Sequence, residues 1–96
     1  LLNYIMKYGA NINCFIGSLK STPLMYACLF NDTSMVKCLV QNNANINISN
    51  IQGNTALAYA ISKHNIELVD YLIDHDADIY HKNNEKKSML DIAYEN

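Results

Sequence analysis

The 96-residue sequence contains no Arg and no Trp, and it has only one Pro and three Gly. Its formal net charge is −2, whereas a nucleic-acid-binding domain normally carries a basic patch, so we expect no nucleic-acid partner. No apolar run approaches the roughly 18 residues that a membrane span needs, and we expect no membrane insertion of this segment.

Cysteine is also scarce. Cys14, Cys28 and Cys38 make an odd number and include no CxxC pair. This usage favours a reducing compartment over a disulfide-stapled scaffold. We therefore expect an intracellular, cytoplasmic protein, or one in the cytosol of a host cell if it acts there.

What the sequence does contain is typical of a packed protein. Hydrophobic residues make up 50% of the chain and charged residues 17%, which argues against disorder. A chain of this length is most simply one domain, and we assign residues 1–96 to it.

A phrase that predicts a helix recurs every 33 residues. The stretches "TPLMYAC", "TALAYAI" and "SMLDIAY" begin at Thr22, Thr55 and Ser88. Each hydroxyl side chain can cap a helix start, and apolar residues at i, i+3 and i+4 share one helical face. These apolar residues are Leu24, Ala27 and Cys28, then Leu57, Ala60 and Ile61, then Leu90, Ala93 and Tyr94.

A second helix is predicted in each unit by another apolar trio. The pairs Asn31-Asp32 and His64-Asn65 lie between the two helices and supply a residue tolerant of positive φ followed by an N-cap. The trios are Leu2, Ile5 and Met6, then Val36, Leu39 and Val40, then Val69, Leu72 and Ile73.

Three similar stretches follow these second helices: "YGANIN" at 8–13, "NNANIN" at 42–47 and "HDADIY" at 75–80. Their Gly9, Asn43 and Asp76 are suited to the left-handed conformation that closes a helix. We expect Ile12, Ile46 and Ile79 to pack inward. Polar connectors at 14–21, 48–54 and 81–87 complete the units.

The order of helix, turn, helix and extended loop, with the phrases "TPLMYAC" and "GNTALAYA", resembles the ankyrin repeat. The resemblance covers essentially the whole chain and implies an all-α solenoid of helix–turn–helix units joined by β-hairpin loops. It divides the chain into a partial unit at 1–21, complete units at 22–54 and 55–87, and a partial unit at 88–96. We therefore expect a piece of a longer array that contacts further repeats of the same chain.

The sequence departs from the family pattern at two positions of the unit. The usual His of the "TPLH" phrase is replaced by Met25, Ala58 and Asp91, so its hydrogen bonds must be absent or substituted. The Gly before the hairpin is present as Gly53 but has become Lys86.

The stretch "DHDADIYHKNNE" at 74–85 places acidic residues at positions 1, 3, 5 and 12 of a calcium loop. Position 6, which needs Gly for a sharp turn, is Ile79. The repeat already accounts for these residues, and we expect no calcium site.

No other pattern predicts a metal, a cofactor or catalysis. His64, His75 and His81 have no zinc-type spacing with the cysteines. Phosphate-binding glycine loops are missing, and nothing in the sequence places a base beside a thiol. We expect a non-enzymatic segment without metal or cofactor.

The resemblance implies that first helices and hairpin tips line a groove that binds another protein. An exposed Leu–Phe pair beside polar residues also suits an interface anchor, although Leu29 and Phe30 are alternatively explained by packing on the neighbouring hairpin. The implied groove residues are Leu29, Phe30, Ser62 and Lys63 on the helices, Ser49, Ile51, Gln52 and Asn54 on the middle hairpin, and Lys82, Asn84, Glu85 and Lys87 on the last.

Two functions remain open at this point. The first is a scaffold that binds a partner protein through the groove. The second is an adaptor or spacer arm of a larger protein, such as an enzyme, a channel, a ubiquitin-ligase component or a host-directed effector, whose activity lies outside this segment.

Overall fold

The computed structural model describes residues 12–95, apart from a few side chains in the last helix. The predicted positions Leu2, Ile5, Met6 and Gly9, and the side chains of Leu90 and Tyr94, lie outside this description. The described chain forms five helices: α2 (Pro23–Leu29), α3 (Thr33–Gln41), α4 (Ala56–Ser62), α5 (Ile66–Asp74) and α6 (Met89–Glu95).

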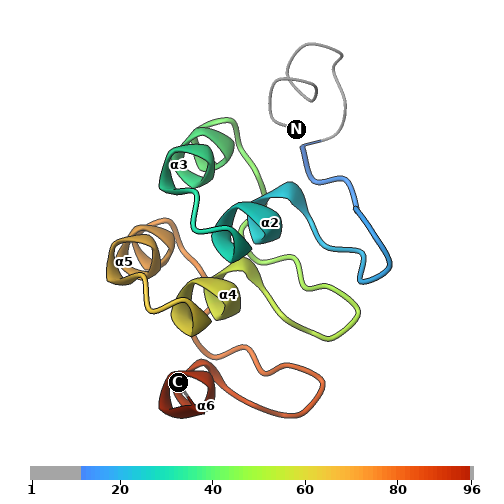
Figure 1. The fold of residues 1–96 in the computed structure, drawn as a ribbon, viewed down its shortest axis with the longest axis vertical. Helices are drawn as coiled ribbons and strands as arrows, with labels where there is room; N and C mark the ends of the chain where they lie inside the picture. Colours follow the sequence, from blue (N-terminus) through green and yellow to red (C-terminus); the bar gives the residue numbers. More distant parts are fainter. Residues whose placement is uncertain (1–11, 96) are drawn as a thin grey trace.

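The helices form two layers, and the connectors form a third (Figure 1). Helices α2, α4 and α6 stack in chain order, with α4 contacting both neighbours, and α3 and α5 pack on α2 and α4 from one side. The connectors project from the other side. Within residues 12–95 the one β-type pairing is an isolated antiparallel bridge between Ile16 and Ser21. The chain is thus an all-α solenoid, as expected.

Each first helix begins at its predicted hydroxyl cap. The Oγ1 atoms of Thr22 and Thr55 accept hydrogen bonds from the third residue of the following turn, at 3.3 Å and 3.5 Å. Ser88 caps α6 reciprocally with Asp91: Asp91 N donates to Ser88 Oγ at 3.2 Å, and Ser88 N donates to Asp91 Oδ2 at 3.0 Å. Hydrogen bonds to the Asp91 carboxylate, first from the Ser88 backbone N–H and then from the Ser88 side chain, hold the pKa of Asp91 below its usual value. The acid at the family's His position therefore completes a capping box.

The predicted turns are present. Asn31 and His64 adopt φ of 60° and 58° between paired helices, and Asn43 and Asp76 adopt 69° and 71° after the second helices. Asp32 and Asn65 cap α3 and α5.

The connectors repeat one left-handed position with different residues. Lys20, Gly53 and Lys86 have φ of 55°, 78° and 63°. A Cβ on Gly53 would lie 2.5 Å from Asn84 Oδ1 and 2.7 Å from Asn84 N. Glycine is thus required at 53 by the close approach of the next connector, whereas lysine occupies the same backbone conformation at 86.

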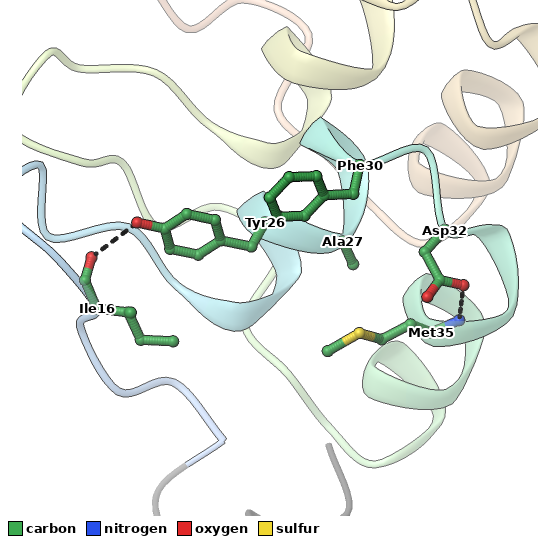
Figure 2. A pocket seen from close by; sticks show the side chains of 6 residues that line it. All are labelled: Ile16, Tyr26, Ala27, Phe30, Asp32 and Met35. Atoms are coloured by element: carbon green, nitrogen blue, oxygen red, sulfur yellow. Dashed lines mark hydrogen bonds between the residues drawn. The ribbon is translucent and has the colours of Figure 1, made fainter. Parts of the chain in front are cut away.

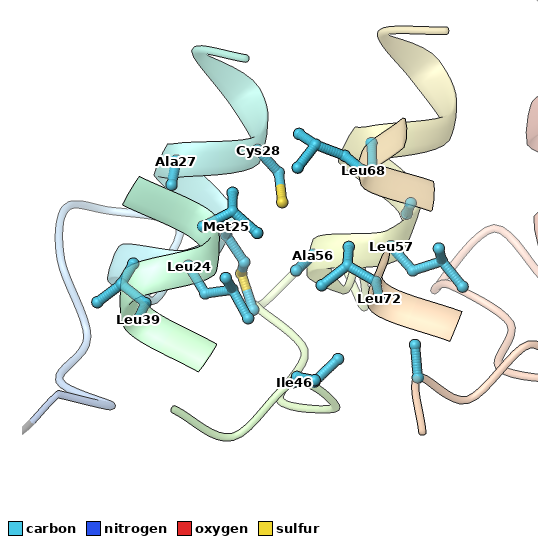
Figure 3. Close-up of a cluster of buried hydrophobic side chains, with 14 of the residues drawn as sticks. Leu24, Met25, Ala27, Cys28, Leu39, Ile46, Ala56, Leu57, Leu68 and Leu72 are labelled. Carbon is cyan, nitrogen blue, oxygen red and sulfur yellow. The ribbon is translucent and has the colours of Figure 1, made fainter. Parts of the chain in front are cut away.

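The core lies between the two helical layers (Figure 3). It contains most of the predicted apolar positions, because each unit covers the stripe of its neighbour. Those confirmed as buried are Leu24, Ala27, Cys28, Val36, Leu39, Ile46, Leu57, Ala60 and Leu72. Leu68, which the apolar trios omit, is also fully buried.

The prediction of inward packing was wrong for Ile79, and two members of the apolar trios are also exposed. Ile73 and Ile79 are each 43% exposed, and Ala93 is exposed. With Ile61 and Ile66 they line an apolar recess of about 510 Å³, which we call the end recess. No other helix of the described chain covers this side of α5 and α6, so these side chains lack the neighbour that buries their counterparts.

Candidate functional site

A polar recess lies between the last two connectors and helices α4 and α6. It has a volume of about 200 Å³, with Ala58 and Ile92 among its lining residues. Four predicted groove residues meet here: Asn54, Ser62, Glu85 and Lys87. Glu85 and Lys87 form an ion pair across 3.1 Å. The recess therefore offers amide, hydroxyl and charged groups to a ligand.

Buried amides fix the connectors that frame the recess, and sequence reasoning missed them. Asn50, which is 6% exposed, accepts hydrogen bonds through Oδ1 from the backbone N–H groups of Gln52 and Asn54. Its Nδ2 donates to Ser21 Oγ at 3.2 Å and to Tyr59 OH at 2.8 Å. One side chain thereby ties the middle connector to the first connector and to α4.

Asn83 occupies the equivalent position 33 residues later. Its Oδ1 accepts from the backbone N–H groups of Glu85 and Lys87 at 2.9 Å and 3.0 Å, and its Nδ2 donates to Asn54 Oδ1 at 3.2 Å. The recurrence of Asn at positions 50 and 83, in the last two connectors, was the signal available in the sequence; the first connector has Gly17 at this position.

Leu29 lies in a second, smaller depression one unit earlier. This apolar notch has a volume of about 40 Å³ and is lined by Leu19, Ser21, Met25, Tyr26, Leu29 and Tyr59. Tyr59 also lines the polar recess, so the two depressions adjoin on the same face of the solenoid.

Phe30 does not line either depression, although we predicted it in the groove. It is 73% exposed and stacks on Tyr26 with ring centroids 6.2 Å apart. Together with Ile16 and Met35 it borders an apolar recess of about 300 Å³ formed by the first connector, α2 and α3 (Figure 2). Phe30 thus borders a different depression from the one lined by Asn54, Ser62, Glu85 and Lys87.

The remaining predicted residues are exposed and none of them lines the polar recess or the notch: Ser49, Ile51, Gln52, Lys63, Lys82 and Asn84. The connectors bearing them are joined in series. Ile51 N donates to Leu19 O at 2.9 Å, and Asn84 N donates to Gln52 O at 3.0 Å. These bonds give the exposed tips a fixed backbone.

Charge is divided between the two sides of the molecule. The last connector, residues 81–87, carries three lysines and one glutamate, a formal charge of 3 − 1 = +2. Residues 66–78, comprising α5 and its C-terminal turn, carry five carboxylates and no lysine, a formal charge of −5. Connectors and α5 lie on opposite sides of the first-helix layer (Figure 1).

Residues 12–95 contain no cluster of three or more His, Cys, Asp or Glu side chains arranged to hold a metal ion. None of the described helices is long and apolar enough to cross a membrane. Burial raises the pKa of the Cys28 thiol to about 12, so this thiol stays protonated and unreactive at neutral pH.

Comparison with known proteins places the repeat in a family. The family model for three copies of the ankyrin repeat matches residues 1–83. An ankyrin repeat protein of Acanthamoeba polyphaga mimivirus is 42% identical over 73% of this chain, and one of Fowlpox virus is 38% identical over 88%. Alpha-latrocrustotoxin of Latrodectus tredecimguttatus is 33% identical over 99%. The chain spans 17%, 26% and 7% of the lengths of these relatives.

Proposed function

This chain belongs to the ankyrin repeat family, and on that premise we propose that it binds a partner protein through the groove formed by the polar recess and the apolar notch. Ankyrin repeats generally mediate protein–protein interaction and are generally non-catalytic. The main support for the proposal is that an apolar depression lies next to a polar one, with Tyr59 lining both. An apolar anchor beside a polar rim is the usual composition of a protein interface.

The groove is prepared for binding because its frame is rigid before a partner arrives. Asn50 and Asn83 satisfy the backbone N–H groups of the two connectors that border the recess. A preorganised surface loses less conformational entropy on association, so a larger share of the contact energy appears as affinity.

A double substitution in the groove tests this function. Leu29→Ser/Ser62→Glu removes the apolar wall of the notch and adds a charge to the recess. Both side chains are half-buried, so the helical circular dichroism should persist. Loss of one interface anchor is worth about 2 kcal/mol or more. We expect capture of the natural partner from a cell extract to fall sharply, with the captured protein identified by mass spectrometry.

The matched control lies on the outer helices. Asp70→Ala/Asp74→Ala changes two exposed residues of α5, and capture should remain. Equal capture by the groove variant and the control would contradict the proposal. Loss of capture by Phe30→Ala alone would move the binding surface to the recess at the other end of the stack.

A second candidate function is that of an arm in a larger protein. Two observations favour it: the chain spans at most 26% of the three relatives' lengths, and the end recess presents a large apolar surface. Reading the open reading frame on both sides of this segment tests it. Further repeats alone favour a binding array, whereas a kinase-like, F-box-like or membrane-spanning segment favours the arm.

We further propose that the protein acts inside a cell, in the cytoplasm or in a host cytosol. The support is the cysteine usage of the sequence, since three cysteines make an odd number and include no CxxC pair, which favours a reducing compartment. Thiol labelling of protein recovered from its native source tests this, and an intermolecular disulfide at Cys14 or Cys38 would contradict it.

A further inference from the structure

We propose that the groove takes an acidic, extended segment of the partner protein, with a small aliphatic side chain seated in the notch. This inference rests on the proposed groove function and adds the chemistry of the partner. Two observations support it. The last connector is positively charged whereas α5 is negatively charged, and the polar recess and the notch offer polar and apolar linings side by side.

One lysine lines the polar recess, where it pairs with Glu85, and three others are neighbours in sequence of residues that line it. Lys87 lines it, and Lys82 and Lys86 belong to the same connector. Lys63 follows Ser62, which also lines the recess. Lys82 and Lys87 both act electrostatically on Asp91 at the start of α6, so their positive field extends beyond the connector. The Debye length of about 8 Å at physiological salt lets a lysine attract a bound acidic segment that it does not touch.

The opposite side of the molecule repels the same partner. Glu67, Asp70 and Asp74 are exposed on α5, and Asp76 and Asp78 follow it. Lys37 pairs with Glu67 of this acidic group at 3.0 Å. An acidic segment is therefore attracted to the connectors and repelled from α5, which fixes the face on which it docks.

The groove lining fits an extended peptide. Asn83 Nδ2 donates to Asn54 Oδ1, Asn54 Nδ2 donates to Gln52 Oε1, and Ser62 Oγ donates to Tyr59 O. Each amide nitrogen still has a second N–H, and the Ser62 oxygen can still accept, so these groups can pair with peptide C=O and N–H. The notch is apolar and, at about 40 Å³, much smaller than the polar recess, so a small aliphatic side chain such as Val suits it. Nucleic acid is the less suited anion, because the chain has no Arg for bidentate phosphate contact and its net charge is −2.

The test is fluorescence anisotropy with the 96-residue chain and a labelled peptide of alternating Glu and Ser that has one central Val. Comparison probes are the same peptide with Lys in place of Glu, and single-stranded DNA of matched charge. We expect the Glu peptide to bind, its affinity to fall as salt rises, and the other two probes to bind weakly or not at all.

Two variants of equal net charge locate the binding. Lys63→Gln/Lys82→Gln removes two positive charges on the connector side. Because each exposed ion pair contributes little, we expect the loss of both lysines to weaken peptide binding by about 2- to 30-fold. Ser34→Glu/Gln41→Glu lowers the net charge equally on α3, where both residues are exposed, and should change affinity by less than about 2-fold. Circular dichroism of both variants checks that they are folded.

Several outcomes would overturn the inference. The Glu peptide could fail to bind, both variants could lose affinity equally, or matched DNA could bind as tightly as the peptide. The groove function is judged separately: if the Lys peptide binds and Leu29→Ser abolishes that binding, the groove is a binding site but its partner is not acidic.

Discussion

Replacing Asn50 with Ala tests whether one buried amide holds the middle connector in place. The substitution removes two hydrogen bonds from backbone N–H groups, at 3.0 Å and 3.1 Å, and two to the hydroxyls of Ser21 and Tyr59. Each such bond contributes about 1 kcal/mol net, and a buried polar group left unpaired costs about 1–3 kcal/mol. Because Ser21 is 4% exposed, water cannot readily replace its lost partner. We expect Asn50→Ala to lower the free energy of unfolding by about 3–5 kcal/mol.

Asn83→Ala is the matched comparison, because Asn83 makes three equivalent bonds but is only half-buried. Water can replace those bonds, so we expect a loss of about 1 kcal/mol. Urea unfolding followed by circular dichroism measures both values. For a domain of this size, the Asn50 variant should also melt more than about 10 °C below the parent chain. Equal losses in the two variants, or an Asn50→Ala value within about 0.5 kcal/mol of the parent, would refute the reasoning.

Three further predictions concern packing, ionisation and backbone conformation. Leu57→Ala should cost about 2–5 kcal/mol, since Leu57 is 1% exposed, and Lys82→Ala at most about 0.5 kcal/mol; equal urea midpoints would contradict the assigned core. Burial raises the pKa of the Cys28 thiol from 9.0 to about 12, so the unfolded chain loses this proton at lower pH than the folded chain. The free energy of unfolding should therefore fall between pH 9 and pH 12. Urea midpoints measured over this pH range should show a smaller fall for Cys28→Ala. Gly53→Ala should cost about 1–3 kcal/mol, because the φ of residue 53 is +78° and the new Cβ would clash with Asn84. Lys86→Gly should be neutral or stabilise by up to about 1 kcal/mol. A melting temperature that is higher for Gly53→Ala than for Lys86→Gly would disprove this.

The candidate site was predictable where a residue's role follows from its place in the repeat. The polar recess brings together Asn54, Ser62, Glu85 and Lys87. The resemblance to the ankyrin repeat was enough to predict them, because it indicates which turn of each unit faces the groove. The position of Phe30 was not predictable in this way, because it depends on whether another element covers the end of α2.

The side-chain amides of Asn50 and Asn83, which frame the groove, were not predicted for a different reason. The sequence is rich in Asn, and nothing local distinguishes Asn50 from its neighbours. Its importance comes from Ser21, 29 residues earlier, and from Tyr59 on the next helix. A hydrogen bond between distant residues leaves no mark in the spacing of one segment.

The sequence by itself determined the helices, their caps and the left-handed residues that end them. These depend on contacts within a few residues, such as Thr22 with Met25, and on the φ that Asn43 or Asp76 tolerates. Only the tertiary structure shows which of the predicted apolar positions have a neighbouring unit to cover them. Ile46 and Ile79 occupy the same position of the repeat, yet they are 8% and 43% exposed, because burial requires a neighbouring unit to cover the side chain and not merely a side chain suited to being covered.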